Sequence, residues 1–220
     1  MKKLVAALLL LNSLVFLHAD ILANGDFSDG KAHWKGDAKS TSDKDAYDMS
    51  TVDNPTAPNG IIVNLLKGTW AKVFQTFNTH EDSFNYSITF KTSADYAPVA
   101  RSNGMGMGMP PGIPGAPGQR NEFLSTILGG DYSGNLNPPR GNDFLLLIID
   151  MTSSTFSSAV IHTTGSTDQQ TVTGVMNHVP AHDEKNIYLI FSPGKGSVTL
   201  LNVSLTPVES PSESVPFPGR

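Results

Sequence analysis

The chain lacks cysteine altogether, and it is poor in aromatic and basic residues. Its 220 residues include no Cys, 8% aromatic residues, and 15 Lys+Arg against 20 Asp+Glu. Without cysteine there is no disulfide and no lipid attachment through an N-terminal Cys, so stability must come from packing, with or without a bound ion. The formal net charge of −5 offers no basic face to a phosphate backbone, and we therefore expect no nucleic-acid partner.

The first 19 residues have the pattern of an export signal. Lys2 and Lys3 precede an apolar stretch from Leu4 to Leu17, and Ala19 supplies the small residue of a cleavage site. The stretch is shorter than the roughly 18 residues of a membrane span, although a retained anchor is the alternative. We predict a signal peptide over residues 1–19, a secreted protein in an extracellular or periplasmic location, and no membrane association after cleavage.

The remaining chain shows the period of strands more than that of helices. Alternating apolar and polar residues over 84–91 predict a half-buried strand, and the continuously apolar run 144–149 predicts a central strand covered on both faces. Further strands are expected at residues 60–66, 70–77, 156–162, 171–175, 187–191 and 198–206. Short strands at this spacing are typical of a β-sandwich.

The closing segment carries two local signals. The apolar runs 187–191 and 197–207 flank a Pro-Gly-Lys-Gly turn, which predicts a β-hairpin. The apolar residues of the second run change face near Leu200 and Leu201, so we expect either a bulge there or a strand buried on both faces.

Motifs at both ends of the mature chain resemble a known family. Asn24-Gly25-Asp26-Phe27, followed by Gly30 and Trp34, and the closing Asn202-Val-Ser-Leu-Thr are similar to the carbohydrate-binding modules of the CenC-like and xylan-binding types. The resemblance covers most of residues 20–207, including the middle block 68–91. It implies an all-β jelly-roll β-sandwich of the galactose-binding-like kind, in which residues 21–27 pair antiparallel with residues 198–206.

Three stretches do not follow the family pattern. Residues 97–121 contain a Gly-Met repeat and a short collagen-like run, and we interpret them as a flexible insertion, with Cu(I) binding by the methionines as the alternative. Residues 129–142 form either the rim of a binding site or an ordinary surface loop. Residues 208–220 have the composition of a disordered tail.

Sugar binding requires aromatic faces with polar groups beside them. Trp70 opens a strand after a turn and is the candidate platform, with Gln75 as a hydrogen-bonding partner on the same strand. Tyr96 and Tyr132 lie in or near loops and complete the candidate ligand set. Trp34, in contrast, stands where the family buries a core tryptophan, so we expect it in the core.

The resemblance also implies a structural calcium ion held between the opening and closing strands. Asp26, Asp29 and Asn202 are the candidate ligands. Ser28 and Asn202 stand where the family commonly has acidic residues, and both departures remove negative charge that a hard cation prefers. Calcium binding and a site without metal therefore both stay open.

The function that the resemblance implies is a secreted, non-catalytic protein that binds a polysaccharide or other glycan. The sequence contains no Gly-x-Ser-x-Gly elbow, no His-Glu-x-x-His pair and no phosphate loop, so we predict that the protein is not an enzyme. The alternative is an extracellular structural or protein-interaction β-sandwich without sugar binding. The glycan and the oligomeric state are left open by the sequence.

Overall fold

The computed structural model describes residues 20–40, 49–52, 59–99, 121–134, 136–177, 179 and 183–208. The predicted signal peptide, the Gly-Met repeat and the tail from residue 209 onward lie outside the described residues.

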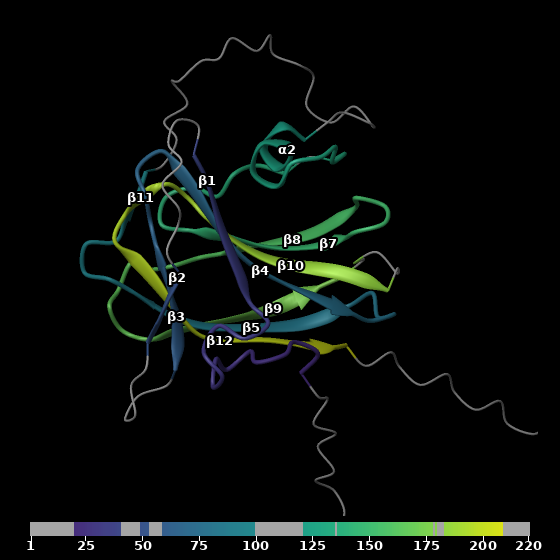
Figure 1. Ribbon diagram of the computed structural model, residues 1–220, viewed down its shortest axis with the longest axis horizontal. Helices are drawn as coiled ribbons and strands as arrows, with labels where there is room; N and C mark the ends of the chain where they lie inside the picture. The colour runs from purple at the N-terminus through teal and green to yellow at the C-terminus, as the bar shows by residue number, and fades with distance from the viewer. Residues whose placement is uncertain are drawn as a thin grey trace, which may run out of the picture.

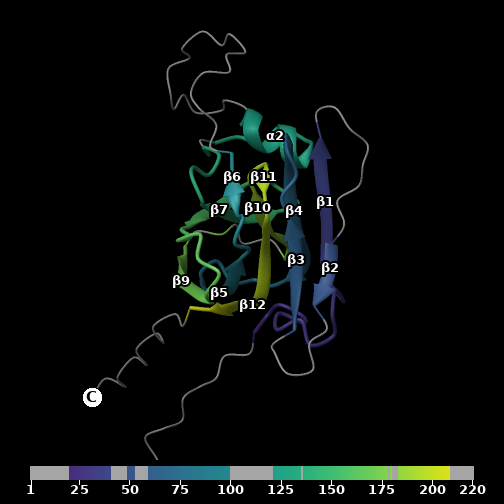
Figure 2. The same cartoon turned by 90° about the vertical axis from the view of Figure 1, so that its left-hand side faces the viewer.

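Two antiparallel five-stranded sheets form the molecule, one above the other in Figure 1. Sheet A has the order β1 (Lys35–Ser40), β4 (Thr69–Asn78), β10 (Glu184–Phe191), β7 (Phe144–Asp150) and β8 (Phe156–Ile161). Sheet B has the order β2 (Met49–Val52), β3 (Gly60–Asn64), β12 (Ser197–Pro207), β5 (Phe84–Thr92) and β9 (Gln170–Met176). A small pair of strands, β6 (Ala97–Pro98) and β11 (Gly194–Lys195), lies beside them, as Figure 2 shows.

The core lies between the two sheets. Every second side chain of the central strands points inward, as period-2 patterning requires, and Leu146, Leu189, Ile88 and Leu205 are fully buried there. The architecture is an all-β jelly-roll sandwich, and the prediction of that fold is confirmed.

Two detailed strand predictions are also confirmed. All seven residues of β7 are buried, because its inner face lies on the core and its outer face lies beneath further apolar side chains. In β12 the register against β5 shifts between Leu200 and Asn202, which is the bulge expected from the change of apolar face.

The predicted hairpin between residues 187 and 207 is wrong. β10 lies in sheet A between β4 and β7, so both of its edges are already paired, whereas β12 lies in sheet B. The Pro-Gly-Lys-Gly turn instead crosses from one sheet to the other. Gly196 has a φ of 79° in this turn, a conformation that glycine adopts without steric cost.

The opening segment lies along β12 as predicted, although it is not a regular strand. The amide of Ile21 donates to the carbonyl of Leu205, and the amide of Val203 donates to the carbonyl of Gly25. These contacts occupy the edge of β12 beyond the point where its pairing with β3 ends. Gly25 is required for this approach, because a Cβ there would collide with the carbonyl oxygen of Val203.

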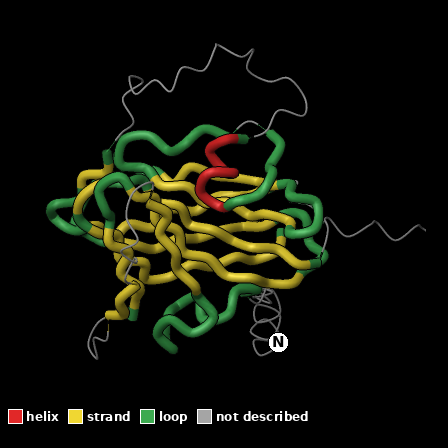
Figure 3. Tube along the Cα trace, turned by 45° about the horizontal axis from the view of Figure 1, so that its top comes forward, coloured by secondary structure: helices red, strands yellow, loops and turns green. Residues whose placement is uncertain are grey.

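One helix, α2 (Glu122–Leu128), was not predicted from the sequence. It covers part of the outer face of sheet A, above β7 and β10 in Figure 1 and in red in Figure 3. Asn121 caps its first turn by accepting a hydrogen bond from the amide of Leu124, and the amide of Gly129 closes its last turn. No helix among the described residues has the length and apolarity of a membrane span.

Candidate functional site

Aromatic side chains gather on the outer face of sheet A. Phe74 of β4 and Tyr188 of β10 are paired across the two strands, and their rings stack with centroids 5.2 Å apart. Phe156 of β8 and Tyr132 of the loop that follows helix α2 (Glu122–Leu128) pack into the same apolar cluster. We call these four residues, Phe74, Tyr132, Phe156 and Tyr188, the aromatic shelf. All except Tyr188 are partly exposed.

A polar chain runs beside the shelf. The hydroxyl of Thr76 donates to the side-chain oxygen of Asn186 over 2.6 Å, and the amide nitrogen of Asn186 donates to the hydroxyl of Tyr188 over 3.1 Å. Burial raises the pKa of Tyr188 and outweighs the hydrogen bond from Asn186, which lowers it, while the nearby Tyr132 raises it, so the phenol is neutral at physiological pH. Because its oxygen accepts from Asn186, the Tyr188 hydroxyl keeps its own proton available for a second hydrogen bond.

Helix α2 covers the neighbouring part of the same face. Trp70 is only 9% exposed and lies edge-on to Phe123 of the helix, with ring centroids 5.0 Å apart. The ammonium of Lys72, itself buried, donates to the carbonyl of Ile127 in the last turn of α2, where a cation is favoured. The predicted platform residue Trp70 therefore supports the helix instead of presenting an open ring.

Gln75 does not lie with the other predicted ligand residues. It is 3% exposed and points from β4 toward the sandwich interior, on the same side as Val73. Its side-chain oxygen accepts from the amide of Ala23, and its side-chain nitrogen donates to the carbonyl of Ala23, both over 2.8 Å. The opening segment therefore uses both polar atoms of Gln75, the residue that the sequence predicts as a sugar contact.

The two predicted tyrosines are separated. Tyr132 belongs to the aromatic shelf, and burial raises its pKa. Tyr96 packs against the inter-sheet core, and its hydroxyl donates to the carbonyl of Asn142 over 2.8 Å. Burial, followed by the charge of Asp143, raises the pKa of Tyr96 strongly. The structure thus brings Trp70 and Tyr132 together and leaves Gln75 and Tyr96 elsewhere.

The predicted calcium ligands lie on adjoining segments. The bond from Val203 to Gly25 places the neighbours of these residues, Asn202 and Asp26, on facing backbones. One carboxylate oxygen of Asp26 accepts from both the amide and the hydroxyl of Ser28, and these bonds lower the pKa of Asp26. Within the described part of the chain, no three His, Cys, Asp or Glu side chains are grouped so that they could hold a metal ion.

Sequence reasoning missed Phe74, Asn186 and Tyr188. The signal was present, because Trp70, Phe74 and Thr76 alternate with inward-facing residues, and both aromatic residues therefore share a face. The pairing of β10 with β4 was not predicted, and without that pairing Tyr188 could not be placed beside Phe74.

No protein-family model and no curated protein matches the chain. Among solved structures, TmCBM61 in complex with β-1,4-galactotriose is similar at a TM-score of 0.49 and 9% identity, covering 86% of this chain and 99% of that one. A family 16 carbohydrate-binding module is similar at a TM-score of 0.47 and 13% identity, covering 86% and 100%.

A family 11 module from Clostridium thermocellum, in complex with a β-1,3-1,4-mixed-linked tetrasaccharide, is similar at a TM-score of 0.47 and 10% identity, covering 86% and 95%. All three of these neighbours are carbohydrate-binding modules. At such low identities the likeness concerns the fold alone. The strand pairing described above establishes that fold independently.

Proposed function

We propose that the protein is a non-catalytic, secreted carbohydrate-binding module that holds a neutral glycan on the aromatic shelf of sheet A. The observation that carries the proposal is the combination of the stacked Phe74 and Tyr188 rings with the Thr76–Asn186 hydrogen bond beside them. An apolar ring surface fits the C–H face of a sugar, and directed hydroxyl and amide groups fit its oxygens.

The aromatic shelf has no charged side chain, which favours a neutral ligand. The side chains that form it and the polar chain beside it are aromatic rings, an amide and hydroxyls. Since the whole chain carries a formal net charge of −5, an anionic polysaccharide would also meet long-range repulsion. Neutral β-linked polymers are therefore the first candidates, and the ligands named for the structural neighbours are of this class.

The alternative function is that of a structural or protein-interaction sandwich. Its support is the partial cover of sheet A by α2, which leaves less open aromatic surface than the row of rings would otherwise provide. Calcium between the opening segment and β12 also remains a proposal that rests on the sequence resemblance alone.

A pull-down against a panel of insoluble and bead-linked polysaccharides tests the proposed function. The panel contains β-1,4-galactan and β-1,3-1,4-glucan as neutral polymers and polygalacturonate as an anionic one. We expect the protein to bind at least one neutral polymer and to leave the anionic polymer unbound. If no polymer in a broad panel retains it, the structural alternative replaces the carbohydrate proposal.

The substitution Phe74→Ala tests whether the glycan binds on the aromatic shelf. Burying such a ring completely against a ligand contributes about 1.5–3 kcal/mol of binding free energy, so its removal should weaken binding about tenfold or more. Ile62→Ala is the matched control, because Ile62 is a half-buried apolar residue on β3 of the other sheet. Equal binding by both variants would contradict the assignment to the shelf.

A further inference from the structure

The outer face of sheet B has a regular arrangement of small uncharged side chains. Three strands, β12, β5 and β9, are paired in register, and three successive outward positions of each strand stand side by side. The three rows are Thr206–Asn85–Val175, Ser204–Ser87–Thr173 and Asn202–Thr89–Thr171. We call these nine residues the hydroxyl grid. All except Val175 carry a hydroxyl or an amide.

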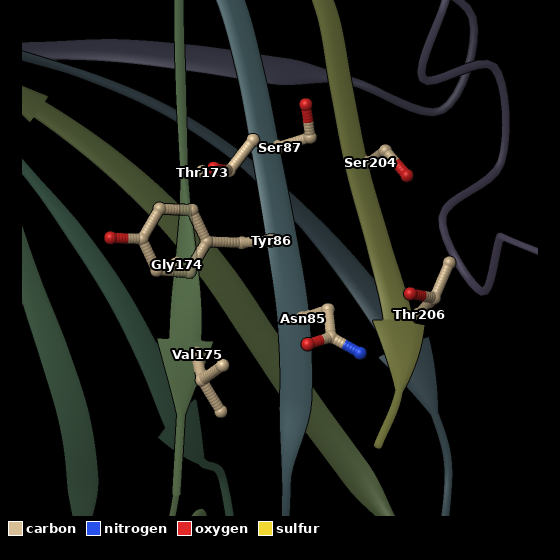
Figure 4. A pocket seen from close by; sticks show the side chains of 8 residues that line it. All are labelled: Asn85, Tyr86, Ser87, Thr173, Gly174, Val175, Ser204 and Thr206. Carbon is tan, nitrogen blue, oxygen red and sulfur yellow. The ribbon is translucent and has the colours of Figure 1, made fainter. Parts of the chain in front are cut away.

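The grid is solvent-facing and hollowed. A shallow groove of about 310 Å³ runs over two of its rows, lined by Asn85, Ser87, Thr173, Val175, Ser204 and Thr206, as the close view in Figure 4 shows. Tyr86 and Gly174 complete the lining. The Tyr86 ring lies at Gly174, where any Cβ would collide with it.

The grid is unusual in carrying no charge. Solvent-facing strands, and edge strands above all, commonly carry lysine or other charged residues that prevent association with other chains. β9 is one of the two edge strands of sheet B, and no residue of its sequence Gln-Thr-Val-Thr-Gly-Val-Met is charged. Val175 on this strand is 53% exposed. A face of this kind is suited to contact with a neutral partner.

The spacing of the grid defines the chemistry of that partner. Neighbouring strands lie about 4.8 Å apart and alternate residues along a strand about 7 Å apart, so donors and acceptors repeat in two directions. Each hydroxyl can both donate and accept. One such pair, the hydroxyls of Thr89 and Thr171, forms a hydrogen bond of 3.0 Å. A polymer with repeating, uncharged hydroxyl groups matches this pattern. The nine grid residues offer an anionic polymer no cation, and Lys91, at the next outward position of β5, is the lysine beside them.

We infer that the hydroxyl grid is a second surface for a neutral polysaccharide, and that one molecule bridges two polymer strands. The inference rests on the proposed function for its first surface, the aromatic shelf. The shelf lies on the outer face of sheet A and the grid on the outer face of sheet B, on opposite sides of the sandwich in Figure 1. Two polymer strands can therefore be held at once without mutual obstruction.

Agglutination of polysaccharide-coated beads tests bridging separately from binding. The full-length protein is added to beads bearing β-1,3-1,4-glucan or β-1,4-galactan, and both the retained protein and the bead turbidity are measured. Ser87→Arg places a long charged side chain at the centre of the grid. Asn64→Arg, at an exposed position of β3 in the same sheet, is the matched control.

We expect wild type and Asn64→Arg to agglutinate the beads. Ser87→Arg should require at least tenfold more protein for agglutination while retaining most of its binding through the shelf. Thr173→Arg, at a more exposed grid position, should behave in the same way and guards against a folding defect of the first variant. Phe74→Ala should also lose agglutination, and the variant with Phe74→Ala and Ser87→Arg together should lose binding.

Three results would overturn the inference. Agglutination by Ser87→Arg at wild-type concentration would show that the grid takes no part. A wild-type dimer that Ser87→Arg converts to a monomer, seen by light scattering, would identify the grid as a self-interface. Complete loss of binding in Ser87→Arg with normal binding by Phe74→Ala would refute bridging and the shelf together. Failure of the proposed function itself is distinct, because wild type would then bind no neutral bead.

Discussion

Asn24 organises the opening turn of the domain, and Trp34 depends on it. The side chain of Asn24 donates to the carbonyls of Gly30 and Ala32, and its backbone carbonyl accepts the indole N–H of Trp34 over 3.1 Å. Trp34 is 4% exposed and packs on the buried ring of Phe27, so the expectation of a core tryptophan is confirmed. The Asn-Gly-Asp-Phe motif is therefore the site of a structural contact network.

Trp34→Ala should lower the free energy of unfolding by roughly 3–5 kcal/mol, because it removes a large ring from between the two sheets. Trp70→Ala should cost less, since Trp70 lies outside that core beneath a short helix. Urea unfolding of both variants measures the difference. A cost for Trp34→Ala equal to or below that of Trp70→Ala would contradict the assigned roles.

Tyr96 makes the stability of the domain depend on pH in the alkaline range. Its folded-state pKa lies well above the value of about 10 in an unfolded chain, because burial and the Asp143 charge disfavour the phenolate. The stability that neutral Tyr96 contributes is complete below pH 10 and is lost as pH rises toward the folded-state pKa. Tyr96→Phe should flatten the loss of stability between pH 10 and 11 in urea unfolding, and an unchanged slope would contradict this role.

At the scale of elements, helix α2 depends on its N-cap residue, Asn121. Asn121 accepts from the Leu124 amide and also donates to the carbonyls of Gly134 and Leu136, so it joins the helix to the following loop. Asn121→Ala should cost about 1 kcal/mol for the cap and more for the loop contacts. Thr126→Ala, an exposed position in the same helix, is the control. If both variants unfold at the same urea concentration, the cap is not the anchor.

Eight of the ten strands in the two sheets could be predicted from sequence, because each carries its own local pattern, such as the alternation of β5 and the continuous apolar run of β7. The predicted ranges do not include β1 and β2. Of the strand arrangement, the contact of the opening segment with β12 was expected from the family resemblance, whereas the pairing of β10 with β4 was not. The turn at residues 193–196 has the local chemistry of a hairpin, and only the filled edges of β10 send β12 to the other sheet. The contact of Gln75 with the opening segment could not be predicted either, because its hydrogen-bonding partner Ala23 lies 52 residues away in the sequence.

At the scale of the whole molecule, the two outer faces differ in chemistry. Sheet A presents aromatic rings with α2 packed over part of them, and sheet B presents hydroxyls and amides. The core that joins them is continuous and apolar, so each face can be changed by substitution without rebuilding the other. We assign glycan binding first to the rings of sheet A.

Titration calorimetry of wild type and Phe74→Ala with a soluble neutral polymer, β-1,3-1,4-glucan or β-1,4-galactan, tests that assignment most directly. Thermal unfolding of both proteins beforehand confirms that each is folded. We predict a saturable heat for wild type and a dissociation constant about tenfold or more higher for Phe74→Ala, with little change for Ile62→Ala. Identical dissociation constants for all three proteins, or no heat with any neutral polymer, would contradict the account.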